Sequence, residues 1–419
     1  MENGEAMGKL AIKGGTPVRT KGFLPWPIYD EREIKAVEEV IRSRHWWRYS
    51  GKKVTEFEEK FAKYHNAKYG VAVTSGTTAL EIALKAADIG PGDEVIVPPY
   101  TFLATASSVL LVNAIPIFVD IDSETYNINP TRIEEAITNK TKAIIPVHFG
   151  GYPADMDRII RIARKHNLVV IEDAAHAHGA IWKGKKVGAI GDMGTFSFQE
   201  SKNISSGEGG IVLTNDKDLA EKCFSLMSFG RMKGGLFYTH HILGWNYRMT
   251  EFQGAILGAQ LERLEEQTNR REKNANYLSE HLRGIKGLSL LKRDDPRVTR
   301  RAYHIYIFKY DKSSFNGVPR ERFIEALKGE GIPCASGYPI PLYKNPMFLE
   351  KKFWHRGCPL SCPFYGKELD YSKVNCPVAE KACYEEAVFL TQNLLLGTKE
   401  DMKNIVRAIK KVVGNIDEL

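Results

Sequence analysis

Residues 70–97 read GVAVTSGTTALEIALKAADIGPGDEVIV, which is a short apolar run, a polar turn, a helical stretch and a second apolar run. The alternation continues to about residue 171, with further apolar runs at residues 115–119, 142–147 and 168–171. Strands that are apolar along their whole length are buried on both faces, and helices between them join strands that run parallel. The sequence therefore predicts an α/β domain whose parallel sheet is covered by helices on both faces.

A lysine stands just after another apolar run. Residues 194–210 read GTFSFQESKNISSGEGG, so the β-prone run from Thr195 to Phe198 ends shortly before Lys202. A lysine that is partly shielded from water loses some of its ammonium character, and a free amine can attack a carbonyl to form a Schiff base. Most lysines are instead exposed and solvated. The residues that follow the neighbouring strands decide between these two interpretations of Lys202.

Small polar residues follow the first strand of the predicted sheet. Ligands of such sheets bind at the carboxyl ends of the strands, and here the sequence is Thr74-Ser75-Gly76-Thr77-Thr78. The backbone N–H groups of Gly76 and Thr77 are expected at the positive end of a helix dipole, a setting that accepts phosphate. The same residues make good helix caps. Both interpretations are open at this point.

An acid and two histidines follow the strand at residues 168–171, in the sequence EDAAHAHG at residues 172–179. Asp173 ends a buried strand and is followed by small alanines, so it is placed to face a ligand, although it could instead cap a helix. His176 and His178 are either ligand contacts or hydrogen-bonded polar residues of the core. The ligand-facing interpretation is favoured because a lysine follows the neighbouring strand.

These strand-end residues together match the needs of pyridoxal phosphate. The cofactor requires a lysine for a Schiff base, an acid that keeps its pyridine nitrogen protonated and an anchor for its phosphate. Lys202, Asp173 and the turn at Gly76 and Thr77 supply all three, and an aromatic residue follows Pro98-Pro99-Tyr100-Thr101. The combination predicts pyridoxal 5'-phosphate as the cofactor.

The order of these motifs resembles the DegT/DnrJ/EryC1/StrS aminotransferases. The resemblance covers most of the chain, from GGTPVR at residues 14–19 to the last predicted helix. It is carried by six further segments: SGT (75–77), PPYTFLA (98–104), EDAAHAHG (172–179), FSFQESK (196–202), GEGG (207–210) and GWNYRM (244–249). It implies fold type I of the pyridoxal phosphate enzymes, with a large domain on a mostly parallel seven-stranded sheet and a smaller C-terminal α+β domain.

The resemblance also assigns roles at the cofactor. Six residues receive one: Lys202 forms the Schiff base, Asp173 pairs with the pyridine nitrogen, Phe102 stacks on the ring, and the backbone of Gly76 and Thr77 holds the phosphate together with the hydroxyl of Ser197. His176 stands where many members of the family place glutamine against the phenolic oxygen of the cofactor. Because histidine can still donate a hydrogen bond there, function is expected to survive with an altered electronic state of the ring.

By the same resemblance, Asn246 and Arg248 belong to a segment that reaches the phosphate or the substrate of the neighbouring subunit. An obligate homodimer with shared active sites is therefore expected. Family members that have become dehydratases tend to carry histidine in place of the lysine. Lys202 therefore favours transamination.

The leading hypothesis for function is an aminotransferase that moves an amino group from glutamate or glutamine to a ketone on a polyhydroxylated six-membered ring. Lys202 would be the general base and acid for the proton shift. The ketone is a nucleotide-linked keto-sugar or a free keto-cyclitol such as a scyllo-inosose, and the start of the chain and residues 198–202 look like the cyclitol branch. A dehydratase or lyase on the same scaffold is the alternative. A non-catalytic regulatory homologue is disfavoured, because Lys202 and Asp173 are both costly to keep without a role.

Composition and charge exclude several other classes of protein. Hydrophobic residues make up 43% of the chain and charged residues 26%, which is an ordinary globular mixture rather than a disordered one. The net charge of +8 is spread along the chain without a basic block that would indicate a nucleic-acid partner. The start has no signal-peptide pattern and no run of about 18 apolar residues occurs. We therefore expect a cytoplasmic protein without a membrane partner.

Six cysteines in a chain of this length do not make a disulfide scaffold. Four of them lie in one stretch, at positions 358, 362, 376 and 383, but their spacing fits none of the usual paired zinc arrangements. No metal site is predicted.

A chain of 419 residues exceeds what one core usually supports, so two domains are expected. A segment of low periodicity forms an N-terminal arm at residues 1–30. The α/β domain follows at residues 31–265, and a smaller α+β domain covers residues 266–419. A long amphipathic helix from about residue 250 to residue 273 is expected to bridge the two domains.

The second domain carries weaker patterns. Residues 302–310 alternate as a half-exposed strand does, and residues 320–328 and 401–413 have helical periodicity. These elements predict a sheet with helices packed beside it.

Overall fold

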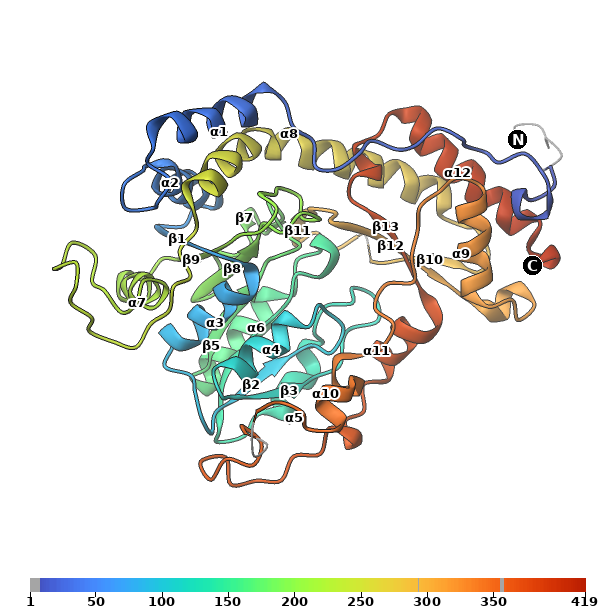
Figure 1. Cartoon of the computed structure of the whole chain (residues 1–419). Coiled ribbons are helices and arrows are strands. Elements are labelled where there is room, and N and C mark those ends of the chain that lie inside the picture. The colour runs from blue at the N-terminus through green and yellow to red at the C-terminus, as the bar shows by residue number, and fades with distance from the viewer. Residues whose placement is uncertain (1–7, 293, 355–357) are drawn as a thin grey trace.

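The computed structural model describes residues 8–292, 294–354 and 358–419, so the first seven residues of the predicted arm lie outside the described residues. Within these ranges, seven strands form the central sheet in Figure 1. Their order across the sheet is β1 (Tyr69–Val73), β9 (Gly210–Thr214), β8 (Met193–Ser197), β5 (Val169–Asp173), β4 (Thr141–Ile144), β2 (Glu94–Val97) and β3 (Ile115–Phe118).

One strand runs against the others. Adjacent strands from β8 to β3 pair in parallel, whereas β9 pairs antiparallel with both β1 and β8. The predicted α/β fold with a mostly parallel seven-stranded sheet is therefore confirmed. Because the strands of like direction end at one edge of the sheet, the residues that follow β1, β5 and β8 meet there.

Helices cover both faces of this sheet. One face is covered by α3 (Gly76–Ala86), α4 (Ala104–Leu111) and α7 (Lys217–Met227), and the other by α2 (Lys53–His65), α6 (Met156–His166) and α8 (Glu251–Leu282). In β2, Val95 and Val97 join the first of these apolar clusters and Ile96 joins the second. Successive side chains of a strand point to opposite faces, so a sheet covered on both sides needs strands that are apolar at every position.

A smaller antiparallel sheet lies in the C-terminal part of the chain. Its strands are β10 (Leu288–Leu290), β12 (Ile305–Tyr310) and β13 (Ala387–Thr391), and the helices α9 (Arg320–Gly329) and α12 (Lys399–Gly414) contribute to the same core. Residues 320–328 and 401–413 are therefore helical, as their periodicity predicts.

The central strand of the small sheet is buried on both faces. Four of the six residues of β12 are buried, so the predicted half-exposed strand is wrong. Tyr306 and Phe308 pack into the core of the small sheet, whereas Ile307 packs into the apolar cluster of the large sheet. The second face of β12 is therefore covered by the apolar cluster of the large sheet, a contact that the local alternation cannot reveal.

The helix α8 is 32 residues long and extends well past the predicted end at residue 273. Leu257 and Leu264, in its first half, join a cluster of the large sheet, and Leu278 and Leu282 join the core of the small sheet. Figure 1 shows α8 running from the side of α1 toward α12. The boundary predicted between residues 265 and 266 falls inside this helix, and the division into an arm and two domains stays a prediction.

The N-terminal segment crosses the small sheet's helices before it reaches α1 (Figure 1). The backbone N–H groups of Ala11 and Val18 both donate to the carboxylate of Glu330, which follows α9. Further along, the indole of Trp26 donates to the carbonyl of Glu200 at 2.6 Å. The segment is thus tied to the loop that carries Lys202.

The remaining α-helices and β-strands of the described residues complete the periphery. They are α1 (Glu31–Ser43), α5 (Ile133–Ala136), α10 (Pro346–Leu349), α11 (Pro377–Lys381) and a small sheet of β11 (Val298–Arg300), β6 (Ile181–Trp182) and β7 (Lys185–Lys186). Of the helices in the described ranges, none has the length and the apolar composition needed to cross a membrane.

Candidate active site

A cavity of about 530 Å³ lies at the carboxyl ends of β1, β5 and β8. Seven of the nine residues that the sequence singles out line it: Gly76, Thr77, Phe102, Asp173, His176, Ser197 and Lys202. The structure therefore brings the predicted lysine, acid and phosphate turn to one place.

Lys202 lies in the loop after β8, where its backbone N–H donates to the carbonyl of Gln199 at 2.9 Å. Its Nζ has no hydrogen-bond partner among the described residues. Burial disfavours the ammonium form and lowers the pKa of Lys202 to about 8, although the nearby carboxylate of Asp173 opposes this shift. An appreciable fraction of Nζ is therefore the uncharged amine near neutral pH, which is the form that attacks a carbonyl.

Asp173 is the last residue of β5 and is only 5% exposed. Its Oδ2 accepts a hydrogen bond from the hydroxyl of Thr105 at 2.8 Å, and its Oδ1 accepts one from the backbone N–H of Ala175 at 3.2 Å. Burial raises the pKa of Asp173, and these donors and the charge of Lys202 oppose the rise. The two donors hold the carboxylate in a fixed orientation in which it can pair with a cationic group in the cavity.

The helix α3 begins at the cavity with Ser75 as its N-cap. The hydroxyl of Ser75 accepts a hydrogen bond from the N–H of Thr78 at 3.2 Å, so the helix-cap interpretation is correct for this residue. The N–H groups of Gly76 and Thr77 have no partner among the described residues, as is usual in the first turn of a helix. A Cβ on Gly76 would lie 2.7 Å from the Cβ of Ser197, so glycine permits the close approach of α3 to β8. The two N–H groups and the Ser197 hydroxyl form a corner suited to an anion.

Phe102 and His176 form two other sides of the cavity. Phe102 is 60% exposed, so its ring is available to a planar ligand. The Nδ1 of the buried His176 accepts a hydrogen bond from the N–H of Gly150 at 3.4 Å, which leaves the ring hydrogen on Nε2. Burial and the nearby charge of Lys202 lower the pKa of His176 well below its ordinary value, so the ring is neutral. In this tautomer His176 can donate a hydrogen bond through Nε2.

Asn246 and Arg248 do not line this cavity within one chain. Both lie in the segment at residues 228–250 between α7 and α8, which we call the arginine loop. Arg248 forms an isolated antiparallel bridge with Val73 at the end of β1, and its guanidinium lies 5.1 Å from the ring centre of Phe229. Its Nε and Nη1 are buried without a hydrogen-bond partner in the described part of the chain. Asn246 is exposed.

Three further residues that shape the candidate site, two in the cavity wall and one beside it, were not predicted from the sequence. Thr105 comes from α4 and orients Asp173, whereas His304 and Tyr338 form a wall supplied by the C-terminal part of the chain. Thr105 is one of three hydroxyl residues in α4, so the sequence does not distinguish it from Ser107 and Ser108, and Tyr338 follows Gly337 in a segment without periodicity. The one available signal was for His304, a lone histidine at the start of an apolar run.

All six cysteines are free thiols, including the four in the stretch from residue 358 to residue 383. Over the ranges that the structure describes, no group of three or more His, Cys, Asp or Glu side chains is arranged to hold a metal ion.

A lysine of lowered pKa, a buried carboxylate and a helix start with two N–H groups unpartnered in the described chain lie at one edge of a mostly parallel sheet, an arrangement typical of α/β enzymes. Comparison with known families makes this class specific. The chain belongs to the DegT/DnrJ/EryC1/StrS aminotransferase family, whose model matches residues 27–369. The family and the enzyme class predicted from the motifs are therefore confirmed, and the protein is an aminotransferase.

Similar proteins span nearly the whole chain. The putative L-glutamine:3-amino-2,3-dideoxy-scyllo-inosose aminotransferase of Streptoalloteichus tenebrarius is 40% identical over 417 residues, which are 98% of this chain and 99% of the relative. The crystal structure of 3-amino-5-hydroxybenzoic acid synthase has a TM-score of 0.84 and 33% identity, and the match covers 94% of this chain and 100% of that one.

A third similar protein bears on the cofactor. The crystal structure of NtdA from Bacillus subtilis, with the cofactor PMP bound, has a TM-score of 0.80 and 27% identity, and the match covers 95% of this chain and 86% of that one. Aminotransferases of this family depend on pyridoxal phosphate in general. The neighbours confirm the fold expected of a pyridoxal phosphate aminotransferase.

Proposed function

We propose that this aminotransferase binds pyridoxal 5'-phosphate in the cavity at Lys202 and transfers the amino group of glutamine or glutamate to a ketone on a polyhydroxylated six-membered ring. A keto-cyclitol of the scyllo-inosose type is the favoured acceptor, and a nucleotide-linked keto-sugar is the second candidate. The observation that carries the proposal is the position of the Nζ of Lys202, unpaired and of lowered pKa, in one cavity with the carboxylate of Asp173 and a free helix N-terminus.

The residues present fit the cofactor at three points. The unpartnered N–H groups of Gly76 and Thr77 and the hydroxyl of Ser197 suit its phosphate, and the carboxylate of Asp173 suits a protonated ring nitrogen. Bound there, the cofactor would supply an electrophilic aldehyde and a ring that withdraws electrons from the bond to be broken.

Each of these side chains would then have a distinct task. The Nζ of Lys202 would bind covalently in the resting enzyme and, once released, would take up a proton at one carbon and return it at another. The fixed carboxylate of Asp173 would keep the facing ring nitrogen protonated. The Nε2–H of His176 would donate to the phenolic oxygen, and the open face of Phe102 would cover the ring.

The choice of acceptor rests on the similar proteins and on the walls of the cavity. The relative from Streptoalloteichus tenebrarius is named for glutamine as donor and for a scyllo-inosose derivative as acceptor. The cavity of about 530 Å³ lies within the usual range for small-molecule sites. Its walls carry hydroxyl, amide and imidazole groups, which suit a ring with several hydroxyls.

The proposed enzyme is a homodimer whose sites are shared. Arg248 keeps two buried nitrogen atoms without a partner in the described chain, and such atoms are costly unless something satisfies them. Leu236, Tyr238 and Leu243, in the same arginine loop, are each more than 80% exposed. A second copy of the chain would cover the exposed side chains of the loop. The phosphate of the cofactor bound in that copy would pair with the buried nitrogen atoms of Arg248.

The test follows the two half-reactions separately. Purified protein loaded with the cofactor is mixed with L-glutamine or L-glutamate alone, and the absorbance of the bound aldehyde form is expected to give way to that of the amine form. Addition of scyllo-inosose should restore the first spectrum and yield the amino-cyclitol, detected by mass spectrometry. A donor step that works while no polyhydroxylated ketone restores the spectrum would contradict the acceptor class, and a spectrum that neither donor changes would contradict the proposed reaction.

A further inference from the structure

His304 occupies a fixed place in the cavity wall, immediately before β12. Its Nδ1 lies 3.2 Å from the Oδ1 of Asn203, the residue that follows Lys202. The Nδ2 of Asn203 donates to the carbonyl of Ala302 at 2.8 Å, which fixes the orientation of the amide and presents Oδ1 to the imidazole. An amide oxygen only accepts hydrogen bonds, so Nδ1 of His304 carries the ring hydrogen and Nε2 carries the lone pair.

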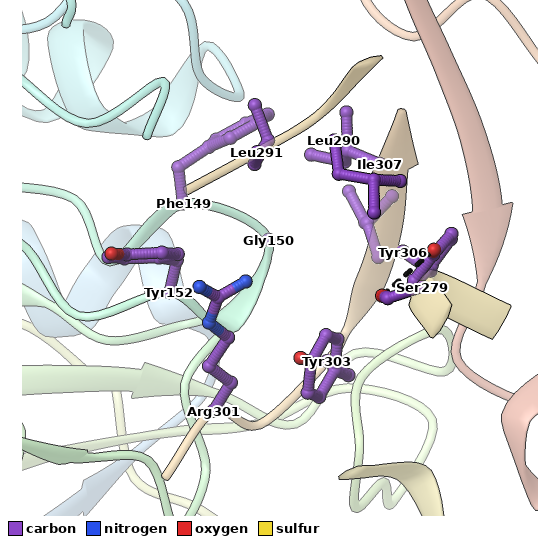
Figure 2. A pocket seen from close by; sticks show the side chains of 11 residues that line it. Phe149, Gly150, Tyr152, Ser279, Leu290, Leu291, Arg301, Tyr303, Tyr306 and Ile307 are labelled. Carbon is purple, nitrogen blue, oxygen red and sulfur yellow. Dashed lines mark hydrogen bonds between the residues drawn. The ribbon is translucent and has the colours of Figure 1, made fainter. Parts of the chain in front are cut away.

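The backbone that leads to His304 is held by the turn at residues 149–151, part of which Figure 2 shows beside Arg301 and Tyr303. The N–H of Ala302 donates to the carbonyl of Gly151 at 3.0 Å, and the guanidinium of Arg301 lies 4.1 Å from the ring centre of Tyr152. A Cβ on Gly151 would lie 2.6 Å from the backbone nitrogen of Tyr303, so only glycine allows this approach.

Tyr303 itself has a φ of 47°, in the left-handed region that non-glycine residues rarely adopt. Such a conformation persists where the surroundings impose it, and it is more frequent at functional sites. Here it turns the chain so that the next residue, His304, reaches the cavity.

The free edge of the His304 ring is neutral and accepts hydrogen bonds. Its Nε2 has no hydrogen-bond partner among the described residues, although the side chain lines the cavity. Burial, with the nearby His176 ring and the charge of Lys202, lowers the pKa of His304 well below its ordinary value. The ring centres of His304 and His176 are 4.4 Å apart, so two neighbouring imidazoles with opposite hydrogen-bonding roles line the cavity. His176 offers an N–H, and His304 offers a lone pair.

We propose that the Nε2 of His304 accepts a hydrogen bond from a hydroxyl group of the ketone acceptor and is a specificity-determining residue for polyhydroxylated rings. The inference rests on the proposed function and extends it to one contact. A lone pair attracts an O–H and repels a carboxylate, so His304 favours the hydroxylated acceptor over the carboxylate groups of the amino-acid donor. A purely positional role, in which His304 serves only to hold Asn203 beside Lys202, is the competing explanation.

Two substitutions separate recognition from positioning, because each keeps one side of the imidazole. His304→Asn can still donate to Asn203 from the place of Nδ1 but loses the acceptor at the place of Nε2. His304→Gln can present an amide oxygen at the place of Nε2 but loses the donor to Asn203. Both variants are prepared as holoenzymes, and the bound-cofactor absorbance reports whether Lys202 is still correctly placed.

For His304→Asn we expect an unchanged cofactor spectrum, a donor step with L-glutamine within about threefold of the wild type, and a kcat/KM for scyllo-inosose about tenfold lower, as the loss of one hydrogen bond predicts. For His304→Gln the acceptor step should be the less affected of the two. Calorimetric titration of the holoenzyme with scyllo-inositol, which has the hydroxyls but no ketone, gives a readout without turnover. Its Kd should rise about tenfold in His304→Asn alone.

Three outcomes would overturn the inference. The first is a wild-type kcat/KM for scyllo-inosose in His304→Asn. The second is an equal loss of rate in the donor and acceptor half-reactions of His304→Asn. The third is a loss of activity in His304→Gln alone, together with an altered cofactor spectrum. If one variant fails to fold, the other still decides, because recognition and positioning predict opposite results for each. If the wild type itself turns over no hydroxylated ketone and does not bind scyllo-inositol, the proposed function fails first, and the wild-type measurement shows this separately.

Discussion

The cavity and the arginine loop differ in how far one chain completes them. Around the cavity, the carboxylate of Asp173 has two donors, and Lys202 is half-buried in the cavity of its own subunit. In the arginine loop, Tyr238 and Leu243 are each 85% exposed, and Arg248 keeps buried nitrogen atoms without a partner in the described chain. The contrast supports the proposal that one chain builds most of the active site, whereas the arginine loop completes the site of a partner. Four experiments test this contrast.

Removal of the lysine should have the largest effect. Lys202→Ala deletes the amine that binds covalently and moves the proton, so turnover of glutamine and scyllo-inosose should fall on the order of 10⁴-fold. The cofactor should still bind noncovalently, because Asp173 and the start of α3 are untouched. Borohydride treatment of the wild type, followed by peptide mapping, should place the cofactor on Lys202. Lys185→Ala, at an exposed lysine of β7, is the control and should be fully active. An adduct on any other lysine contradicts the assignment.

Mixed dimers test whether the arginine loop of one subunit completes the cavity of the other. If Arg248 completes the partner's cavity, Arg248→Ala and Lys202→Ala should each be inactive alone, and a mixture after subunit exchange should regain about a quarter of wild-type activity. That fraction follows because half of the dimers are mixed and each has one intact site of two. The measurement is the initial rate before and after exchange.

The matched control for this experiment replaces Arg248→Ala with Arg42→Ala, at an exposed arginine of α1. Arg42→Ala should be active by itself. When it is mixed with Lys202→Ala, the activity should be that of the Arg42→Ala chains present in the mixture and should not rise after subunit exchange. Two inactive chains that exchange subunits, as light scattering or tagged pull-down can show, and yet regain nothing would rule out a shared site through Arg248.

The same contrast explains how much could be predicted from the sequence. Lys202 and Asp173 each follow an apolar run, and parallel strands place such residues at one edge of the sheet, so local patterns were sufficient. His304 precedes β12, which packs against the apolar cluster of the large sheet through Ile307, and Tyr338 packs on Tyr100 beside the same cluster. These contacts join distant parts of the chain, and no local periodicity encodes them. The same packing buries the face of β12 that its alternation had suggested was exposed.

The pH dependence of cofactor attachment sharpens the description of the cavity. Burial lowers the pKa of Lys202 to about 8. The fraction of Lys202 in the uncharged amine form therefore rises about tenfold per pH unit below pH 8 and levels off above it. Attachment of pyridoxal phosphate to cofactor-free protein, followed by absorbance, should show the same rise and plateau. In Asp173→Asn the midpoint should move to lower pH, since the carboxylate favours the ammonium form. A rate that still climbs between pH 9 and pH 10 would mean that the lysine is solvated like an ordinary one.

The smallest expected effect separates structural from functional atoms within a single turn. The hydroxyl of Ser75 caps α3, so Ser75→Ala should lower the free energy of unfolding by about 1 kcal/mol, measured by urea denaturation without cofactor. Cofactor affinity should change less than threefold, because the N–H groups of Gly76 and Thr77 belong to the backbone and survive the substitution. Thr77→Ala is the matched control: its hydroxyl makes no hydrogen bond among the described residues, so its loss should leave stability unchanged. Helix capping and phosphate binding then use different atoms of one turn. Unchanged stability with a tenfold loss of cofactor affinity in Ser75→Ala would instead assign the hydroxyl itself to the phosphate.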